Sequence, residues 1–316
     1  MITEPRIFYK PFEYQTAFEY YKNQHRAHWL ADEIPLASDL NDWKLKLTES
    51  EKNLIGNILK SFAQTEVHVN DYWSTKVSIW FPKPEIQAMA RAFADFESIH
   101  AEAYARLNEE LGLDNFQAFL EDEASKAKIE RLIEVPGESL EEKALSLAIF
   151  SAFTEGVNLF SSFAVLMSFQ LRNLMKGTAQ IVEWSVRDES LHSQAGCWLF
   201  RTLLQEQPHL DTNSMRDKVI EACHLSVQLE FDFIDKAFEM GNIEGLTKEQ
   251  LKNYIKARAN EKMIELGYKA IYNDIDPNLL KQIEWFGHLT SGKSHQDFFA
   301  QRPTNYAKST ADWSDL

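Results

Sequence analysis

The chain has 316 residues and a formal net charge of −15, with 33 basic against 48 acidic side chains. Binding to phosphates needs clustered Lys and Arg side chains, so this charge balance argues against a nucleic-acid surface. Only 11 Gly and 9 Pro interrupt the sequence, which favours long helices with few turns over a many-stranded sheet.

The N-terminal part of the chain predicts two helices. The first covers about residues 11–29 and is rich in aromatic side chains. The second follows a capping box, in which Thr48 caps the first turn and Glu51 reaches back to it. Glu66 interrupts the apolar stripe of this second helix, and a carboxylate there is costly unless it is paired or bound to a metal ion. The apolar members of the stripe are Ile55, Leu59, Phe62, Val69 and Trp73.

A third expected helix carries the spacing Glu97-x-x-His100. Residues three apart lie one above the other on a helix, so the carboxylate and the imidazole share a face. Tyr104 extends that face by one turn, and Gly112 is the expected C-terminal stop. The charged segment that follows, about residues 114–134, predicts smaller surface helices.

The most apolar stretch lies between Lys143 and Arg172, where Glu155 is the only charged residue. Its length would cross a bilayer, but polar Ser, Thr, Asn and Gln side chains are spread through it. We therefore expect a helix buried on all sides within a bundle, opened by a capping box at Ser139 and Glu142. An isolated charge in this setting needs a cation nearby, so Glu155 is a candidate ligand like Glu66.

The second half of the chain predicts three more helices. The helix at about residues 177–204 carries Glu189-x-x-His192, a second copy of the paired motif. Two further helices, at about residues 214–240 and 247–272, complete the body, and the last of them again opens with a capping box.

The C-terminal end differs from this helical body. After Gly287 the chain turns polar and irregular, which predicts a mobile tail. We therefore expect one helical domain over residues 1–289 and a flexible tail over residues 290–316.

Two other Glu-x-x-His spacings compete with the two motifs above. Glu206 and His209 enclose a proline and fall in a polar connection, which indicates coincidence. Glu221 and His224 lie on an expected helix, beside charged residues 216–218 that indicate an exposed helix start. The pairs between the long apolar helices are therefore the better candidates.

Six side chains from four expected helices form one candidate metal site: Glu66, Glu97, His100, Glu155, Glu189 and His192. Two Glu-x-x-His pairs, with one Glu from each of two further helices, are the ligand set of ferritin-like dimetal carboxylate bundles. Four carboxylates balance the charge of two divalent ions, and such a set suits iron or manganese better than zinc. The alternative is a bundle in which each glutamate is paired with a cationic side chain.

In these motifs the sequence resembles the small, radical-generating subunit of class I ribonucleotide reductase over nearly its whole length. The resemblance rests on residues 62–66, on Glu97-x-x-His100-x-x-x-Tyr104, on Glu155, and on Arg187-Asp188-Glu189-x-x-His192. It implies an all-α, ferritin-like helical bundle with additional helices, a homodimer, and a dimetal centre that an oxygen species oxidises. The oxidising equivalent would then pass to a separate large subunit, where ribonucleotides are reduced to deoxyribonucleotides.

The resemblance also implies roles for single residues. Tyr104 falls where many members carry the tyrosyl radical, Trp29 matches the pathway tryptophan, and Asp188 matches the carboxylate that links this tryptophan towards the metal centre. Tyr306 matches the tail tyrosine that relays the radical between subunits, and residues 311–316 look like the segment that docks on the large subunit. The positions that match the six metal ligands are Glu66, Glu97, His100, Glu155, Glu189 and His192.

One combination departs from both familiar branches of this family. The diiron-tyrosyl branch usually has Asp where this chain has Glu66, and the manganese-iron branch usually has Phe in place of Tyr104. Helical spacing also places Ser185 one turn before Glu189, facing Tyr104. A polar neighbour protects a long-lived tyrosyl radical poorly. Our hypothesis is therefore a dimanganese centre (Mn/Mn) that holds the oxidising equivalent on the metal ions, with Tyr104 as a bystander. Fe/Fe and Mn/Fe centres accept the same ligands and stay open.

Three other functions stay open as well. Another ferritin-like oxidase or monooxygenase component shares the six ligands, but it has no need of Trp29, Asp188 and a docking tail. Metal-storage chains are usually shorter and lack such a tail. A helical scaffold without metal is disfavoured by the carboxylates of Glu66 and Glu155 in apolar surroundings.

Location and further partners follow from weaker signals. The two cysteines, Cys197 and Cys223, give no disulfide framework, and no export signal is visible at the N-terminus. We therefore expect a cytoplasmic protein. An activating flavoprotein is a further candidate partner, as part of the family resemblance.

Overall fold

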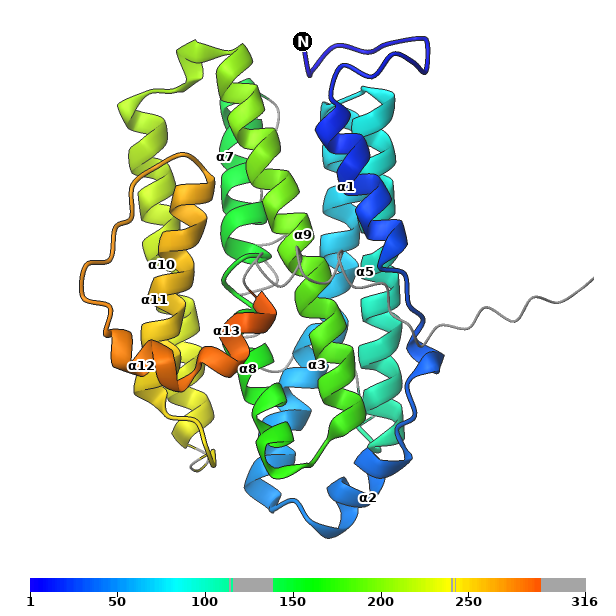
Figure 1. Ribbon diagram of the computed structural model, residues 1–316, viewed down its shortest axis with the longest axis vertical. Helices are drawn as coiled ribbons and strands as arrows, with labels where there is room; N and C mark the ends of the chain where they lie inside the picture. The colour runs from blue at the N-terminus through cyan, green and yellow to red at the C-terminus, as the bar shows by residue number, and fades with distance from the viewer. Residues whose placement is uncertain (114, 116–138, 240, 242, 291–316) are drawn as a thin grey trace, which may run out of the picture.

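The computed structural model describes residues 1–113, 115, 139–239, 241 and 243–290, and this part of the chain contains helices but no β-strand (Figure 1). The predicted all-α class is therefore confirmed. Up to residue 113 the elements are α1 (Gln15–Arg26), η1 (Ala31–Glu33), α2 (Ala37–Leu45), α3 (Glu49–Asp71), η2 (Tyr72–Val77), α4 (Ser78–Trp80) and α5 (Pro84–Glu110). From residue 139 they are α7 (Leu140–Leu147), η4 (Ala148–Thr154), α8 (Phe160–Ser168), η5 (Phe169–Arg172), α9 (Lys176–Glu206), η6 (Pro208–Leu210), α10 (Asn213–Glu239), α11 (Lys248–Glu265), α12 (Pro277–Gln282) and α13 (Glu284–Thr290).

The long helices pack side by side as a bundle. α3 lies along α5, and α1 also packs on α5 (Figure 1). α9 contacts η4 and α8, while α10 and α11 form a pair at the side of the bundle away from α5. The core between these helices is apolar and rich in aromatic side chains, such as Phe62, Phe93 and Phe163.

The local sequence signals for helix starts are confirmed. The three capping boxes form at Thr48, Ser139 and Thr247, each with both reciprocal hydrogen bonds. The apolar stripe of α3 is buried together with Glu66, which is 0% exposed. α5 ends at Glu110, and Gly112 adopts a positive φ of 74°, as expected for a glycine that stops a helix.

The expectation of one continuous helix between Lys143 and Arg172 is wrong. After α7 the chain widens into the π-helix η4, in which the amide of Glu155 donates to the carbonyl of Phe150, five residues earlier. A turn over residues 155–159 then separates η4 from α8. Only glycine fits at position 156, because a Cβ there would collide with the carbonyl of Ala152.

Two smaller expectations near the C-terminus also need correction. The helix expected to reach residue 272 ends at Glu265, where Gly267 turns the chain with a positive φ of 93°. The chain expected to become irregular after Gly287 stays helical, because α13 runs to Thr290.

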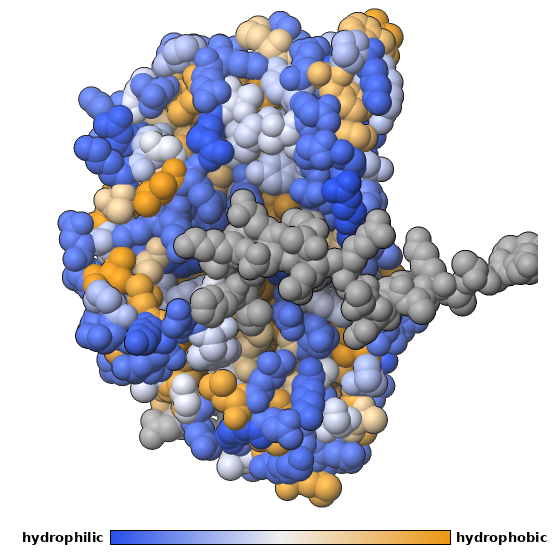
Figure 2. Space-filling view, viewed as in Figure 1, coloured by the Kyte–Doolittle hydropathy of each residue, from blue (hydrophilic) through white to orange (hydrophobic). Residues whose placement is uncertain are grey.

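The face in Figure 2 is mostly hydrophilic, with hydrophobic residues scattered over it. Within the described ranges, none of the helices combines the length and the apolar character that a bilayer span requires.

Candidate metal centre

Six side chains from four segments of the bundle converge in its interior. They are Glu66 of α3, Glu97 and His100 of α5, Glu155 directly after η4, and Glu189 and His192 of α9. Each of them is at most 1% exposed. The structure therefore brings together all six candidate ligands that the sequence analysis selected.

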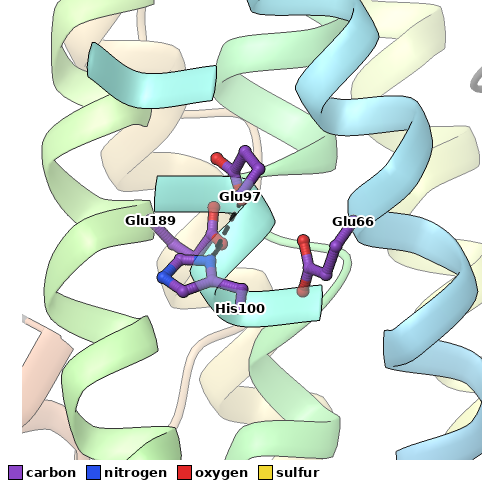
Figure 3. Close-up of side chains that lie close together, drawn as sticks. All are labelled: Glu66, Glu97, His100 and Glu189. Atoms are coloured by element: carbon purple, nitrogen blue, oxygen red, sulfur yellow. Dashed lines mark hydrogen bonds and ion pairs between the residues drawn. The ribbon is translucent and has the colours of Figure 1, made fainter. Parts of the chain in front are cut away.

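The ligand atoms form two overlapping groups, and within each group they lie within 4.8 Å of one another. Glu97 and Glu189 belong to both groups, so their carboxylates lie between two positions for an ion. Each position adds one imidazole and one further carboxylate of its own. The first position adds Glu66 and His100 (Figure 3), and the second adds Glu155 and His192.

Both imidazole rings turn the same nitrogen towards the shared carboxylates. His100 Nδ1 lies 3.0 Å from Glu97 Oε2 and 3.2 Å from Glu189 Oε1. His192 Nδ1 lies 2.7 Å from Glu97 Oε1 and 3.9 Å from Glu189 Oε2. Each of the two ion positions would therefore have one Nδ1 atom beside the shared carboxylates.

The other nitrogen of each ring is occupied by a hydrogen bond. His100 Nε2 lies 3.3 Å from Asp188 Oδ2, and His192 Nε2 lies 3.0 Å from Gln24 Oε1. An N–H at Nε2 can donate to the oxygen in each pair, and in that tautomer Nδ1 carries the lone pair that can bind a cation. Metal-binding histidines are commonly held in this way.

Several carboxylate oxygens of the cluster have no donor. Both oxygens of Glu66 and Oε2 of Glu155 are buried without a hydrogen-bond partner in the described part of the chain. A buried polar atom left unsatisfied costs about 1–3 kcal/mol, and more if it is charged. The protein groups alone therefore leave this cluster unfavourable, and cations would relieve the cost.

The electrostatics of the cluster lead to the same conclusion. Burial and the charges of Glu189 and Glu97 raise the pKa of Glu66 well above its ordinary value, and the same causes raise the pKa of Glu155. Burial opposes ionisation of Glu97 as well, but His192 and His100 lower the pKa of its carboxyl to about 2. Without metal the cluster would hold protons that divalent cations can replace.

The donor set fits two divalent ions. It consists of four carboxylates and two imidazoles, without sulfur. Oxygen-rich sets with imidazole suit iron and manganese, whereas structural zinc sites are mostly built from sulfur and imidazole. The charge of four carboxylates also balances that of two divalent cations, which makes burial of the group tolerable.

Trp29 is connected to the cluster through Asp188. The indole nitrogen of Trp29 donates to Asp188 Oδ2 over 2.8 Å, and this same oxygen accepts from His100. The other oxygen, Oδ1, accepts from Arg187 over 3.2 Å. Although burial opposes it, the charge of Arg187 and the hydrogen bond from His100 lower the pKa of Asp188, so this carboxylate stays ionised.

Tyr104 lies beside the cluster but is hydrogen-bonded elsewhere. Its hydroxyl donates to Ser185 Oγ over 2.9 Å, as the helical spacing predicted. Both side chains are 0% exposed, and the Tyr104 ring packs against Phe62 with 4.9 Å between ring centroids. Burial raises the pKa of the phenol, so it keeps its proton.

Two residues of the site were missed in the sequence. Gln24 is buried at 0% exposure and orients His192, and Trp73 donates from its indole nitrogen to Glu155 Oε1 over 2.6 Å. The only signal for Trp73 was its place on the apolar stripe of the helix predicted after Thr48, and nothing singled out Gln24. Hydrogen bonds across helices depend on packing, which the spacing of a single helix does not reveal.

The competing motifs do not join the cluster. Glu206 accepts hydrogen bonds from the backbone of Ile2 and from Tyr14, and both Glu221 and His224 are exposed. The segment at residues 114–134 and the tail at 291–316, with Tyr306, lie outside the described residues except for position 115.

Comparisons with known proteins agree with this site. The family model described as ribonucleotide reductase, small chain, matches residues 6–278. A protein of Invertebrate iridescent virus 3, described as a ribonucleoside-diphosphate reductase small subunit, is 34% identical over 98% of this chain and 86% of its own length.

Solved structures share the fold. A protein from Bacillus halodurans described as a class I ribonucleotide reductase superposes with a TM-score of 0.79, at 23% identity, over 86% of this chain and 99% of its own. The dimanganese(II) form of the NrdF protein from Streptococcus sanguinis gives a TM-score of 0.76 at 20% identity, over 89% of this chain and 99% of its own. These neighbours confirm the ferritin-like bundle. With the family match over most of its length, the chain belongs to the ribonucleotide reductase small-chain family.

Proposed function

We propose that this chain is the subunit that generates and stores the oxidising equivalent of a ribonucleoside-diphosphate reductase. The family is one of oxidoreductases, in which the small subunit acts with a large subunit. The observation that carries the proposal is the connection of Trp29 through Asp188 to His100, because it links the interior metal cluster to an aromatic side chain outside the cluster.

In this proposal the six clustered side chains hold two divalent ions. Glu97 and Glu189 would contribute to both positions, since they belong to both groups. Glu66 and His100 complete one position, and Glu155 and His192 complete the other. Two ions held there would supply the one-electron oxidising chemistry.

The surrounding side chains orient the ligands and exclude water. Asp188 keeps the Nε2 proton of His100 in place and accepts the indole N–H of Trp29 on the same oxygen atom. Arg187 holds the second oxygen of Asp188, so the carboxylate cannot turn away. Trp29 is 2% exposed, so the connection lies in the dry interior.

Another ferritin-like oxidase or a metal-storage protein would use the same six ligands. Neither function requires an indole hydrogen-bonded to the carboxylate that orients a ligand histidine. No observation on this chain favours these alternatives over a reductase subunit.

For the metal we propose a dimanganese centre, in which the oxidising equivalent stays on the ions. The hydrogen bond from Tyr104 to Ser185 supports this choice. A phenol that forms a radical has to give its proton to a base, and the hydroxyl group of Ser185 is not a base. The dimanganese(II) state described for the Streptococcus sanguinis neighbour agrees with this choice. Fe/Fe or Mn/Fe loading remains compatible with the donor set.

For partners we propose a homodimer and a large subunit that binds the tail at residues 290–316, with Tyr306 as the relay. An activating flavoprotein and a cytoplasmic location stay predictions. Both described cysteines, Cys197 and Cys223, are free and buried, which agrees with a reducing compartment.

Deletion of the residues after Gly292 tests the proposed function. The shortened chain should bind two ions, as measured by metal analysis, but lose ribonucleotide reduction when mixed with its large subunit. A shortened chain that keeps full activity would contradict the reductase assignment. Electron paramagnetic resonance of the active full-length protein then identifies the metal pair.

A further inference from the structure

A second tryptophan contacts the metal cluster, at the ion position that the Trp29 connection does not reach. Trp73 donates its indole N–H to Glu155 Oε1 over 2.6 Å, and its ring lies edge-on to His192 with 6.1 Å between centroids. Glu155 and His192 are the two residues that belong only to the second ion position. Trp29 serves the first position, through His100. Each position therefore has an indole group of its own.

Aromatic rings continue from Trp73 towards the surface. The ring of Tyr72 lies 5.9 Å from that of Trp73, and the ring of Trp80 lies another 5.9 Å from that of Tyr72, both in edge-to-face contact. Exposure rises along this order, from 0% at Trp73 and 2% at Tyr72 to a half-buried Trp80. The three rings thus lead from a ligand carboxylate to solvent.

Two π-helices position the two inner rings, those of Tyr72 and Trp73. Tyr72 and Trp73 begin the π-helix η2, whose wider turn departs from the phase of α3. Tyr72 stacks on Phe150 of the other π-helix, η4, with 3.6 Å between centroids and 16° between ring planes. Its hydroxyl lies 3.2 Å from Ser146 Oγ. π-Helical turns recur at functional sites, and here both flank the Glu155 side of the cluster.

We propose that Trp73, Tyr72 and Trp80 form a second one-electron path, through which a small reductant in solvent discharges the metal centre when no large subunit takes the oxidising equivalent. The inference rests on the proposed function, because it needs an oxidisable pair of ions. A reductant of the ascorbate or thiol class supplies the electron at Trp80.

The transfer moves one electron, and the proton that the oxidised ascorbate or thiol loses passes to solvent water. The reductant loses one electron at Trp80, and one electron passes from Trp73 towards the Glu155 side of the cluster. The indole proton of Trp73 stays in its hydrogen bond to Glu155. Burial raises the pKa of Tyr72, and the hydroxyl of Ser146 is no base, so the phenol keeps its proton and its ring serves as a bridge between the indoles.

Mapping of oxidised residues tests the path without any variant. The metal-loaded protein is activated repeatedly without reductant or large subunit, and its peptides are analysed by mass spectrometry for oxygen added to tryptophan. Trp80 should be modified several-fold more than Trp198, which is also half-buried but packs against Tyr14 and Tyr20. Metal-free protein that receives the same activating treatment should show no preference for modification of Trp80 over Trp198. Equal modification of Trp80 and Trp198 would overturn the proposal.

A pair of variants tests the rate of discharge. The optical or spin-resonance signal of the oxidised centre is followed after addition of ascorbate. Trp80→Phe should slow its loss several-fold, whereas the matched Trp198→Phe should leave the rate unchanged. If the oxidised centre forms in Trp80→Phe and its signal decays at the rate of the parent protein, the second path is wrong while the proposed function stands. If no oxidised centre forms in the metal-loaded parent protein, the proposed function fails and the path fails with it.

Discussion

Trp29 and His100 donate to one and the same atom, Asp188 Oδ2, at 2.8 and 3.3 Å. The two rings are also stacked, with 5.8 Å between their centroids and 26° between their planes. A single carboxylate oxygen therefore orients a ligand of the metal cluster and a tryptophan from a distant part of the chain. This arrangement makes Asp188 a sensitive position.

Asp188→Asn should lower ribonucleotide reduction or metal affinity by about 10–100-fold, the usual cost of removing a partner of a metal-binding histidine. The amide keeps the size of the carboxylate but cannot accept both donors on a charged oxygen. Activity with the large subunit and metal content are measured together. Asp232→Asn, at an exposed site of α10, is the control. Unchanged activity and metal content in Asp188→Asn would contradict a role for this carboxylate.

Single ligand deletions should separate the two ion positions. Glu66→Ala should lose the first ion and keep the second, and Glu155→Ala should do the reverse, because each residue belongs to one group only. Glu97→Ala should lose both ions, since Glu97 is shared. Metal analysis after exhaustive dialysis gives the stoichiometry, with exposed Glu102→Ala as the control on the same helix. Equal losses in Glu66→Ala and Glu97→Ala would contradict the assignment of bridging carboxylates.

Metal affinity should rise with pH. Burial and neighbouring charges raise the pKa values of Glu66 and Glu155, so in the metal-free protein these carboxyls keep protons at a pH where free glutamate is ionised. A cation must displace the protons, and a higher pH lowers the cost of doing so.

Calorimetric titration with Mn²⁺ in buffers of different ionisation heat, from about pH 6 to about pH 8, would count the released protons. Glu66→Gln should release fewer protons than the parent protein, because the amide carries none to lose. Binding without proton release would show that the carboxyls are ionised before the metal arrives.

Tyr104→Phe should retain activity if the oxidising equivalent stays on the metal ions. The substitution removes the hydrogen bond to Ser185 and leaves that hydroxyl without its partner, which should cost about 1 kcal/mol of stability. Thermal unfolding measures the loss, and Tyr104→Phe combined with Ser185→Ala should recover part of it. A tyrosyl spin-resonance signal that disappears in Tyr104→Phe together with turnover would contradict the dimanganese hypothesis.

The helices and the six clustered residues were predictable because they depend on local signals. Capping boxes such as Thr48 with Glu51 mark helix starts through contacts three residues apart. Glu66 stands out because a charge on an apolar stripe requires compensation. The spacing of three in Glu97 and His100 places both on one face of any helix. None of these inferences needs knowledge of how helices pack against each other.

Features that depend on packing between segments were not predictable in this way. The break after Thr154 reflects a π-helix and close contacts at Gly156, whereas the apolar composition of this stretch also suits an unbroken helix. Gln24 reaches His192 across 168 positions of sequence, and nothing near Gln24 marks it as a partner. Trp73 was visible as an apolar residue, but its hydrogen bond to Glu155 became apparent only from the arrangement of η2 beside η4.

Trp73→Phe should weaken the second ion position selectively. Phenylalanine keeps an aromatic ring against Phe93 and His192 but removes the N–H that donates to Glu155 Oε1 over 2.6 Å. Loss of a group that orients a ligand carboxylate typically costs about 10–100-fold in metal affinity, and the first position has no contact of this kind with Trp73. Competition with a chelator of known affinity should therefore resolve one ion of normal and one of reduced affinity. Equal weakening of both ions would mean that Trp73 supports the whole bundle, and unchanged affinity would mean that η4 alone holds Glu155 in place.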